Sequence, residues 1–306
     1  YQAGNTGNIG EAELARSEAD AAMQFLAGTP YAINANLICN HLLYSLYREA
    51  NQLDIARSFE TDAKRFVGQL EAFPDFNMGN FHAALVLEDC GEVEEARQRY
   101  LNLLRVNSNF DRYTIAQFLY RQNEVDYALK LLEGTTKDSL LFALKAQLIA
   151  EDPARQSEAR EMLRSWSQPW GAGEFPGVIP GLLCVIGYPN VAAEQAQRVL
   201  ELELAGTEDP FLRNKYLLFA GQVKPEDLLA SAGGSRTKEC EAHHLIAQWA
   251  LGHGCREYAI NHLRQCVGAP WFSEYRNARS LLAKLEDENW PHWLDGEAEV
   301  NAIIEN

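Results

Sequence analysis

Positive charge is scarce in this chain. The 306 residues include 27 lysines and arginines against 43 aspartates and glutamates, a net charge of −16. Nucleic acids and anionic membrane surfaces attract proteins through basic patches, so this balance argues against both as partners. The sequence also lacks any apolar run of about 18 residues, the length that a membrane-spanning helix needs, and we expect no such helix.

Cysteine pairs are lacking too. Six cysteines are spread over the chain, and no two of them form a Cys-x-x-Cys pair. Most stand among the apolar residues of predicted helices, where a free thiol packs as a small hydrophobic group. Sparse, unpaired cysteine is typical of a reducing compartment, so the sequence predicts a cytoplasmic protein.

Strand signals are few, because no sustained alternation of apolar and polar residues lies between hairpin turns. Helical periodicity covers most of the chain, and 47% apolar residues are enough to bury a core. The sequence therefore predicts an all-α protein. The expected helices span residues 11–26, 34–50, 53–73, 78–90, 93–106, 112–122, 125–133, 138–150, 154–166, 178–186, 191–204, 210–220, 225–232, 238–251, 255–267 and 272–287.

A local pattern repeats at four of the predicted turns. Asn or Gly at the turn is followed five residues later by Ala, and in three cases a larger apolar residue comes four positions after that. Asn or Gly accepts the left-handed backbone that ends a helix, and the small Ala allows a close approach of the next helix. The pattern predicts antiparallel helix pairs. Its turn residues are Asn51, Gly91, Asn123 and Gly254, its alanines are Ala56, Ala96, Ala128 and Ala259, with Ala159 and Ala196 extending the series, and its larger residues are Tyr100, Leu132 and Leu263.

These helix pairs resemble the tetratricopeptide repeat (TPR) family, most closely over residues 77–109, 110–134 and 240–267. The resemblance implies an α-solenoid, a TPR-like superhelix of about six to seven hairpins with a capping C-terminal helix. The units vary in length, few have the family's closing Pro, and Glu60 stands where an apolar residue is expected, so another irregular α-solenoid is the alternative. The implied organisation is an N-terminal arm and capping helix (1–33), repeats (34–166), a Trp/Pro/Gly loop (167–177), repeats with the capping helix (178–287) and an acidic tail (288–306).

A second resemblance concerns the end of the chain. Residues 272–293 are similar to the ends of repeat regions in bacterial multidomain proteins, where such regions often follow a Ser/Thr kinase domain. No kinase motif lies within this sequence. The resemblance implies a regulatory arm that serves other domains of the same polypeptide.

The TPR resemblance also implies which residues face the concave groove, namely positions 2, 5, 9, 12 and 13 of each first helix. Tyr113, Tyr120 and Arg121 are of the types that supply binding energy at interfaces. The alternative is that these side chains only pack against neighbouring helices. The family's Lys/Asn carboxylate clamp is not reproduced. The expected groove residues are His41, Ser45, Arg48, Phe81, Glu88, Tyr113, Gln117, Tyr120, Arg121, His244 and Gln248.

Catalytic signatures are missing from the sequence. It has no Walker loop, no G-x-S-x-G elbow, no H-E-x-x-H helix and no EF-hand, so we predict neither an enzyme nor a cofactor. Cys240 and His244 on one helix, with His262 and Cys266 on the next, could ligate zinc. The repeat already explains Cys266 as an interhelical packing residue, so no metal site is predicted.

The sequence thus favours a non-catalytic scaffold that binds a peptide, a helix or a neighbouring domain in its groove. The acidic balance favours partners with basic segments. Two alternatives stay open: a regulatory arm of a larger enzyme such as a kinase or protease, and an enzyme on an α/α helical scaffold. The aromatic loop of residues 166–175 either staples itself to the helices or anchors a partner.

Overall fold

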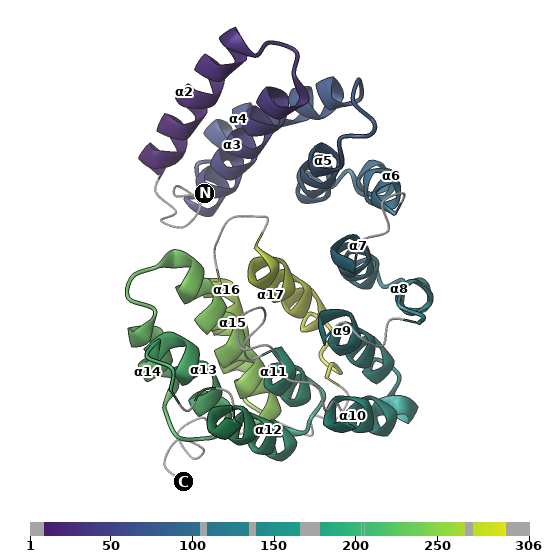
Figure 1. The fold of residues 1–306 in the computed structure, drawn as a ribbon, viewed down its shortest axis with the longest axis vertical. Coiled ribbons are helices and arrows are strands. Elements are labelled where there is room, and N and C mark those ends of the chain that lie inside the picture. Colours follow the sequence, from purple (N-terminus) through teal and green to yellow (C-terminus); the bar gives the residue numbers. More distant parts are fainter. Residues whose placement is uncertain are drawn as a thin grey trace. The chain divides into compact units, whose positions relative to one another are not determined.

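The computed structural model describes residues 9–104, 109–134, 139–165, 178–202, 204, 206–266 and 272–291. The secondary structure of these residues is helical and contains no strand, which confirms the all-α prediction (Figure 1). None of their helices combines the length and the hydropathy needed to cross a bilayer. The aromatic loop at 167–177 and the tail beyond residue 291 lie outside the described residues.

The chain divides into two compact units. Unit 1 comprises residues 1–111 and 268–273, and unit 2 comprises residues 112–267 and 274–306. The boundary falls at residue 111, near the start of one predicted helix pair, whereas the sequence suggested a division at 167–177. Each unit brings together segments that are far apart in the sequence.

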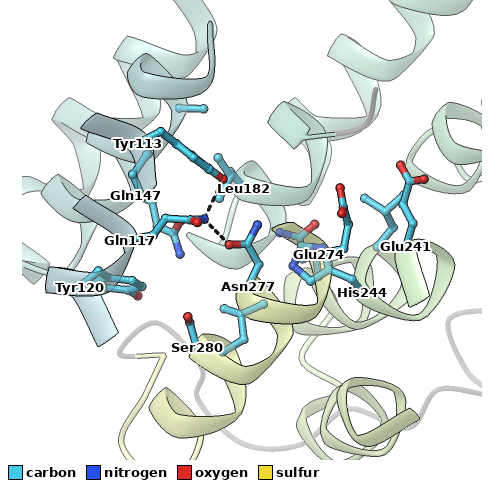
Figure 2. A pocket seen from close by; sticks show the side chains of 15 residues that line it. Tyr113, Gln117, Tyr120, Gln147, Leu182, Glu241, His244, Glu274, Asn277 and Ser280 are labelled. Atoms are coloured by element: carbon cyan, nitrogen blue, oxygen red, sulfur yellow. Dashed lines mark hydrogen bonds between the residues drawn. The ribbon is translucent and has the colours of Figure 1, made fainter. Parts of the chain in front are cut away.

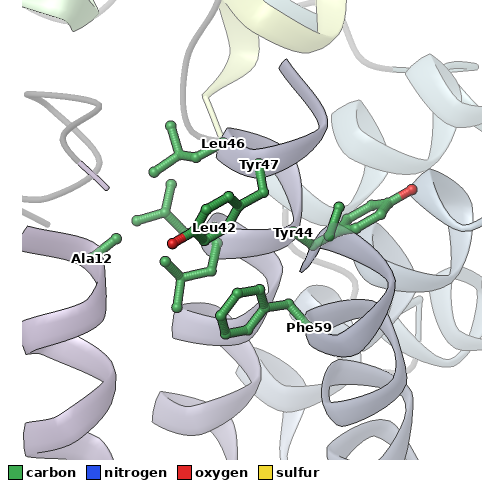
Figure 3. Packing of buried hydrophobic residues seen from close by; sticks show 8 residues of the cluster. Ala12, Leu42, Tyr44, Leu46, Tyr47 and Phe59 are labelled. Atoms are coloured by element: carbon green, nitrogen blue, oxygen red, sulfur yellow. The ribbon is translucent and has the colours of Figure 1, made fainter. Parts of the chain in front are cut away.

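Unit 1 is built on the tight pairing of two long helices. Its apolar cluster contains the stacked rings of Tyr47 and Phe59, whose centroids lie 5.4 Å apart, and Ala12 packs against it from the N-terminal helix (Figure 3). The helix expected from Asn34 begins earlier, at Pro30, because the Thr29 hydroxyl caps it and proline suits the first turn. The helices are α2 (Ile9–Phe25), α3 (Pro30–Glu49), α4 (Leu53–Leu70), α5 (Asn77–Asp89) and α6 (Val93–Leu103).

The helices of unit 2 are α7 (Asn109–Arg121, of which the first three residues belong to unit 1), α8 (Val125–Leu131), α9 (Ser139–Ala150), the short 3-10 helix η1 (Pro153–Arg155), α10 (Gln156–Ser165), α11 (Val178–Val185), α12 (Pro189–Leu202), α13 (Pro210–Phe219), α14 (Pro225–Ser231), α15 (Arg236–Gly252), α16 (Arg256–Gln265) and α17 (Ser273–Lys284, of which Ser273 belongs to unit 1). They pack in consecutive pairs, as α9 with α10, α11 with α12, α13 with α14 and α15 with α16 (Figure 1).

The predicted turns have the expected backbone. Asn51, Gly91, Asn123 and Gly254 all adopt positive φ angles, between 57° and 82°. All six alanines of the pattern are buried, as are the larger residues that follow three of them. The local rule of a left-handed turn, a small residue and a larger residue is therefore confirmed. The buried set is Ala56, Ala96, Ala128, Ala159, Ala196, Ala259, Tyr100, Leu132 and Leu263.

Helix α15 departs from simple neighbour-to-neighbour stacking, because it packs against α11 as well as α13. Glycine makes this approach possible: a Cβ atom on Gly252 would lie 2.7 Å from the Cβ of Cys184, and one on Gly181 would overlap the amide oxygen of Gln248. The contact brings the polar side chains of α15 towards the helices of the earlier pairs.

Candidate functional site

A cavity in unit 2 collects side chains from five helices. It is lined from α7 by Tyr113, Gln117 and Tyr120, and from α15 by His244 and Gln248 (Figure 2). These are five of the six groove residues that the sequence predicted in this unit. Helices α9, α11 and α17 complete the lining, and the space open to water-sized molecules is about 50 Å³.

Three buried polar atoms of this lining have no hydrogen-bond partner among the described residues. They are the amide oxygens of Gln117 and Gln248 and the Nε2 atom of His244. The exposed fractions of these residues are 5%, 4% and 6%. Most buried polar groups in proteins are bonded, and leaving one unbonded costs about 1–3 kcal/mol. Three such atoms at one cavity mark a place where a polar occupant would be stabilised.

The α7 side of the cavity is held by hydrogen bonds. The Gln117 amide nitrogen donates to the Tyr113 hydroxyl at 2.7 Å and to the Asn277 side-chain oxygen of α17 (Figure 2). The Tyr120 hydroxyl donates to the Glu151 carboxylate at 2.5 Å, and Lys284 of α17 binds the same carboxylate at 3.0 Å. The two bonds of the Gln117 amide nitrogen orient that side chain and leave its oxygen as the unused acceptor.

Burial controls the charge of the site. It lowers the pKa of His244 to about 4, so the imidazole is neutral near neutral pH. It also raises the pKa of Tyr113 to about 12, and the pKa of Tyr120 well above its ordinary value, where the Glu151 carboxylate adds to the effect. Near neutral pH the aromatic and imidazole groups of the lining are therefore uncharged.

Two carboxylates, Glu241 and Glu274, supply the charge of the lining. Burial raises the pKa of Glu241, while the Lys215 ammonium, 2.5 Å from its Oε1 atom, acts to lower it. Both carboxylates are only partly buried, as are Gln147 and Asn277, so these residues lie on the more accessible part of the lining.

Helix α17 differs from the predicted end cap. Its Asn277 and Lys284 contact residues on α7 and beside the end of α9, about 130 to 160 positions earlier in the chain. At its C-terminal end, Arg256 donates hydrogen bonds to the backbone carbonyls of Leu285 and Asp287. Since α17 also lines the cavity, it helps to build the site and does not merely cover the pair before it.

The predicted groove residues of unit 1 form a separate set with internal contacts. His41 is buried, and its Nε2 atom lies 2.9 Å from the Asp89 carboxylate. The Arg48 guanidinium donates to the Tyr44 hydroxyl at 3.0 Å and packs over its ring. Ser45 is also buried, so these side chains mainly join helices of unit 1.

The other predicted groove residues of unit 1 are half-buried. Glu88 accepts a hydrogen bond from the Tyr100 hydroxyl at 2.8 Å, and Phe81 packs against the ring of His82. In unit 2, Arg121 is half-buried at the end of α7 and does not line the cavity.

The sequence did not predict several of the residues that line the cavity. Glu241 occupies groove position 2 of its unit, so the same register could have found it. Gln147 belongs to a pair whose turn breaks the local pattern. Glu274, Asn277 and Ser280 reach the cavity only because α17 lies beside α7 and α15, and no local signal indicates that placement.

The Cys/His cluster forms two contacts between α15 and the end of α16. The sulfur atoms of Cys240 and Cys266 lie 2.7 Å apart, and the Nδ1 atoms of His243 and His262 lie 2.9 Å apart. In the described part of the chain, no group of three or more His, Cys, Asp or Glu residues is arranged to hold a metal ion. The cluster joins two packed helices.

Comparison with known proteins gives no match to this sequence, either among family models or among curated proteins.

Proposed function

We propose that the chain is a non-catalytic scaffold for protein–protein interaction, an α-solenoid of TPR-like helix pairs that binds a peptide, a helix or a neighbouring domain. The cavity of unit 2 is its anchoring site. The observation that carries this proposal is the convergence of three buried, unpartnered polar atoms on one cavity, at positions that the repeat register assigned to a groove. A partner that supplies hydrogen bonds there removes their desolvation cost.

Helix α17 supports the same reading, because it already lies against the first helices α7 and α15 of unit 2. A surface that holds one amphipathic helix is suited to hold protein segments. This also favours the alternative in which the groove serves other domains of the same polypeptide. The size of the native polypeptide in an immunoblot of the source cell separates the two, since a species near 34 kDa counts against the alternative.

The non-catalytic part of the proposal has a structural argument in unit 1. His41 with Asp89 is an arrangement of base and orienting carboxylate, and Ser45 lies one turn from His41 on α3. The Ser45 hydroxyl is buried and makes no hydrogen bond to the described residues, His41 included. An activated nucleophile needs that bond, so we interpret His41 and Asp89 as a structural pair.

A display library of random peptides tests the scaffold proposal. Selection on the wild-type protein should enrich a shared motif, and the enriched peptides should lose binding to the double variant His244→Phe, Gln248→Met. Gln222→Met, at an exposed glutamine, is the matched control and should bind like the wild type. Peptides that bind all three proteins equally, or no enrichment at all, would contradict a binding site at this cavity.

A further inference from the structure

The unpartnered atoms of the cavity define the hydrogen bonding of its occupant. The amide oxygens of Gln117 and Gln248 can only accept hydrogen bonds, and the neutral imidazole of His244 can accept or donate at Nε2. The Gln117 oxygen is held as an acceptor because its amide nitrogen donates to Tyr113 and Asn277. Together with the Gln248 oxygen, which lies beside Gly181, it favours an occupant that carries at least two donors. A group with acceptors alone would face the lone pairs of both amides.

The charged side chains of the lining are acidic, which favours a cation over an anion. Glu241 and Glu274 place two carboxylates on the lining. Of the buried cations near it, Lys215 is paired with Glu241, and Arg276 is engaged within the protein. A carboxylate or phosphate would therefore find no lysine or arginine on the lining, and it would approach the Glu274 carboxylate.

The size of the cavity distinguishes between cationic groups. One water needs about 10–15 Å³ of such space, so 50 Å³ takes roughly three to five water-sized atoms. A guanidinium has four heavy atoms and five N–H donors in a plane, whereas an ammonium has a single heavy atom. The rings of Tyr113 and Tyr120 add aromatic surface to the lining, which also suits a guanidinium.

We propose that the cavity of unit 2 binds the guanidinium group of an arginine side chain in a partner protein. This inference rests on the proposed scaffold function and specifies its partner. Free arginine is the less suitable source, because its own carboxylate would approach Glu241 and Glu274. An arginine within a basic segment has no such carboxylate, and the chain's net charge of −16 attracts basic segments.

Nuclear magnetic resonance with blocked tripeptides tests this inference. The probes are acetyl-Gly-Arg-Gly-amide, its lysine and citrulline counterparts, and free L-arginine. The arginine peptide should shift the side-chain amide resonances of Gln117 and Gln248 and bind about tenfold more tightly than the citrulline peptide, which keeps the shape without the charge. The lysine peptide and free arginine should also bind more weakly.

Two variants change the site in different ways. Gln248→Met removes one acceptor, and Gly181→Ala adds a methyl group that must displace the same amide. Each should weaken the arginine peptide by about tenfold, while Gln222→Met should leave it unchanged. Folding of each variant is checked from its amide spectrum, so that a loss of binding is not confused with a loss of structure.

The outcomes separate this inference from the scaffold proposal. Equal binding of the arginine and citrulline peptides, preference for lysine or free arginine, or no shift with any probe would overturn the arginine assignment; the last result would leave waters as the occupants. If the display library then still yields cavity-dependent peptides without arginine, the scaffold proposal stands alone. If the selected peptides bind independently of the cavity, both the arginine assignment and the scaffold proposal are contradicted.

Discussion

Replacing Gln248 with methionine should make the protein more stable. The side chain is 4% exposed, its amide oxygen lacks a partner, and its amide group forms no hydrogen bond with the described residues. The substitution therefore removes no bond from the structure. Methionine has a similar length and a flexible apolar side chain, so it can fill the same space against Gly181.

The magnitude follows from the cost of the unsatisfied oxygen. Leaving a buried polar group unbonded costs about 1–3 kcal/mol, so we expect the free energy of unfolding to rise by at least about 1 kcal/mol. In a unit of this size, that corresponds to an increase in Tm of about 2–4 °C. Urea titration followed by tryptophan fluorescence is a suitable assay, because Trp249 and Trp290 are buried in unit 2.

Gln222→Met is the control for a surface exchange. It removes one exposed hydrogen bond, from Gln222 to Gln197, and should change stability by no more than about 0.5 kcal/mol. A loss of stability in Gln248→Met, or a change no larger than that of the control, would refute the reasoning. It would mean that water or another group satisfies the amide in solution. The cavity would then lose the free energy that we assign to partner binding.

Three further predictions concern packing, protonation and the thiols. Gly252→Ala should lower the free energy of unfolding by about 1–3 kcal/mol, because the added methyl group clashes with α11. Gly68→Ala, in open space on α4, should raise it by about 0.5–1 kcal/mol. Urea unfolding followed by circular dichroism compares the two variants, and the opposite order of stability would contradict the contact between α15 and α11. As the pH falls from 6.5 to about 4, the free energy of unfolding should fall by up to about 3 kcal/mol, because the His244 imidazole takes up a proton in the unfolded chain before it does so in the folded one. The variant His244→Leu should lose less stability over this range, and a loss equal to that of the wild type would count against the prediction. Hydrogen peroxide, which is small enough to reach buried thiols, should link Cys240 to Cys266 in a disulfide and be reduced to two waters. Recovery of both protein thiols by peptide mass spectrometry would disprove it.

The helix pairs could be predicted because their signals are local. Asn51 and Gly91 end helices in left-handed turns, and Ala56 and Ala96 fill the interhelical contact, so each pair is encoded within about ten residues. Helix periodicity located the remaining elements for the same reason. The largest difference in bounds lies at the start of α3, where the Thr29 cap sets the first turn.

The cavity could be predicted only in part, because it depends on contacts between distant segments. Gln117 and His244 were found through the repeat register, which assigns groove positions without knowing what faces them. The approach of α15 to α11 depends on Gly181 and Gly252, and each of these glycines matters only because of a residue on the other helix. Asn277 lies 160 residues from its partner Gln117. Such pairings carry no periodic signal in a single sequence.

The same register position has opposite outcomes in the two units, and this contrast explains where the site arises. His41 and His244 both occupy position 5 of a first helix, and both are buried. His41 meets Asp89, at the end of the next first helix, and its hydrogen bond is made within the protein. His244 lies where α15 meets α11 and α17, and its Nε2 atom remains unbonded. At this position regular stacking thus satisfies the imidazole, and the irregular contact leaves it unbonded.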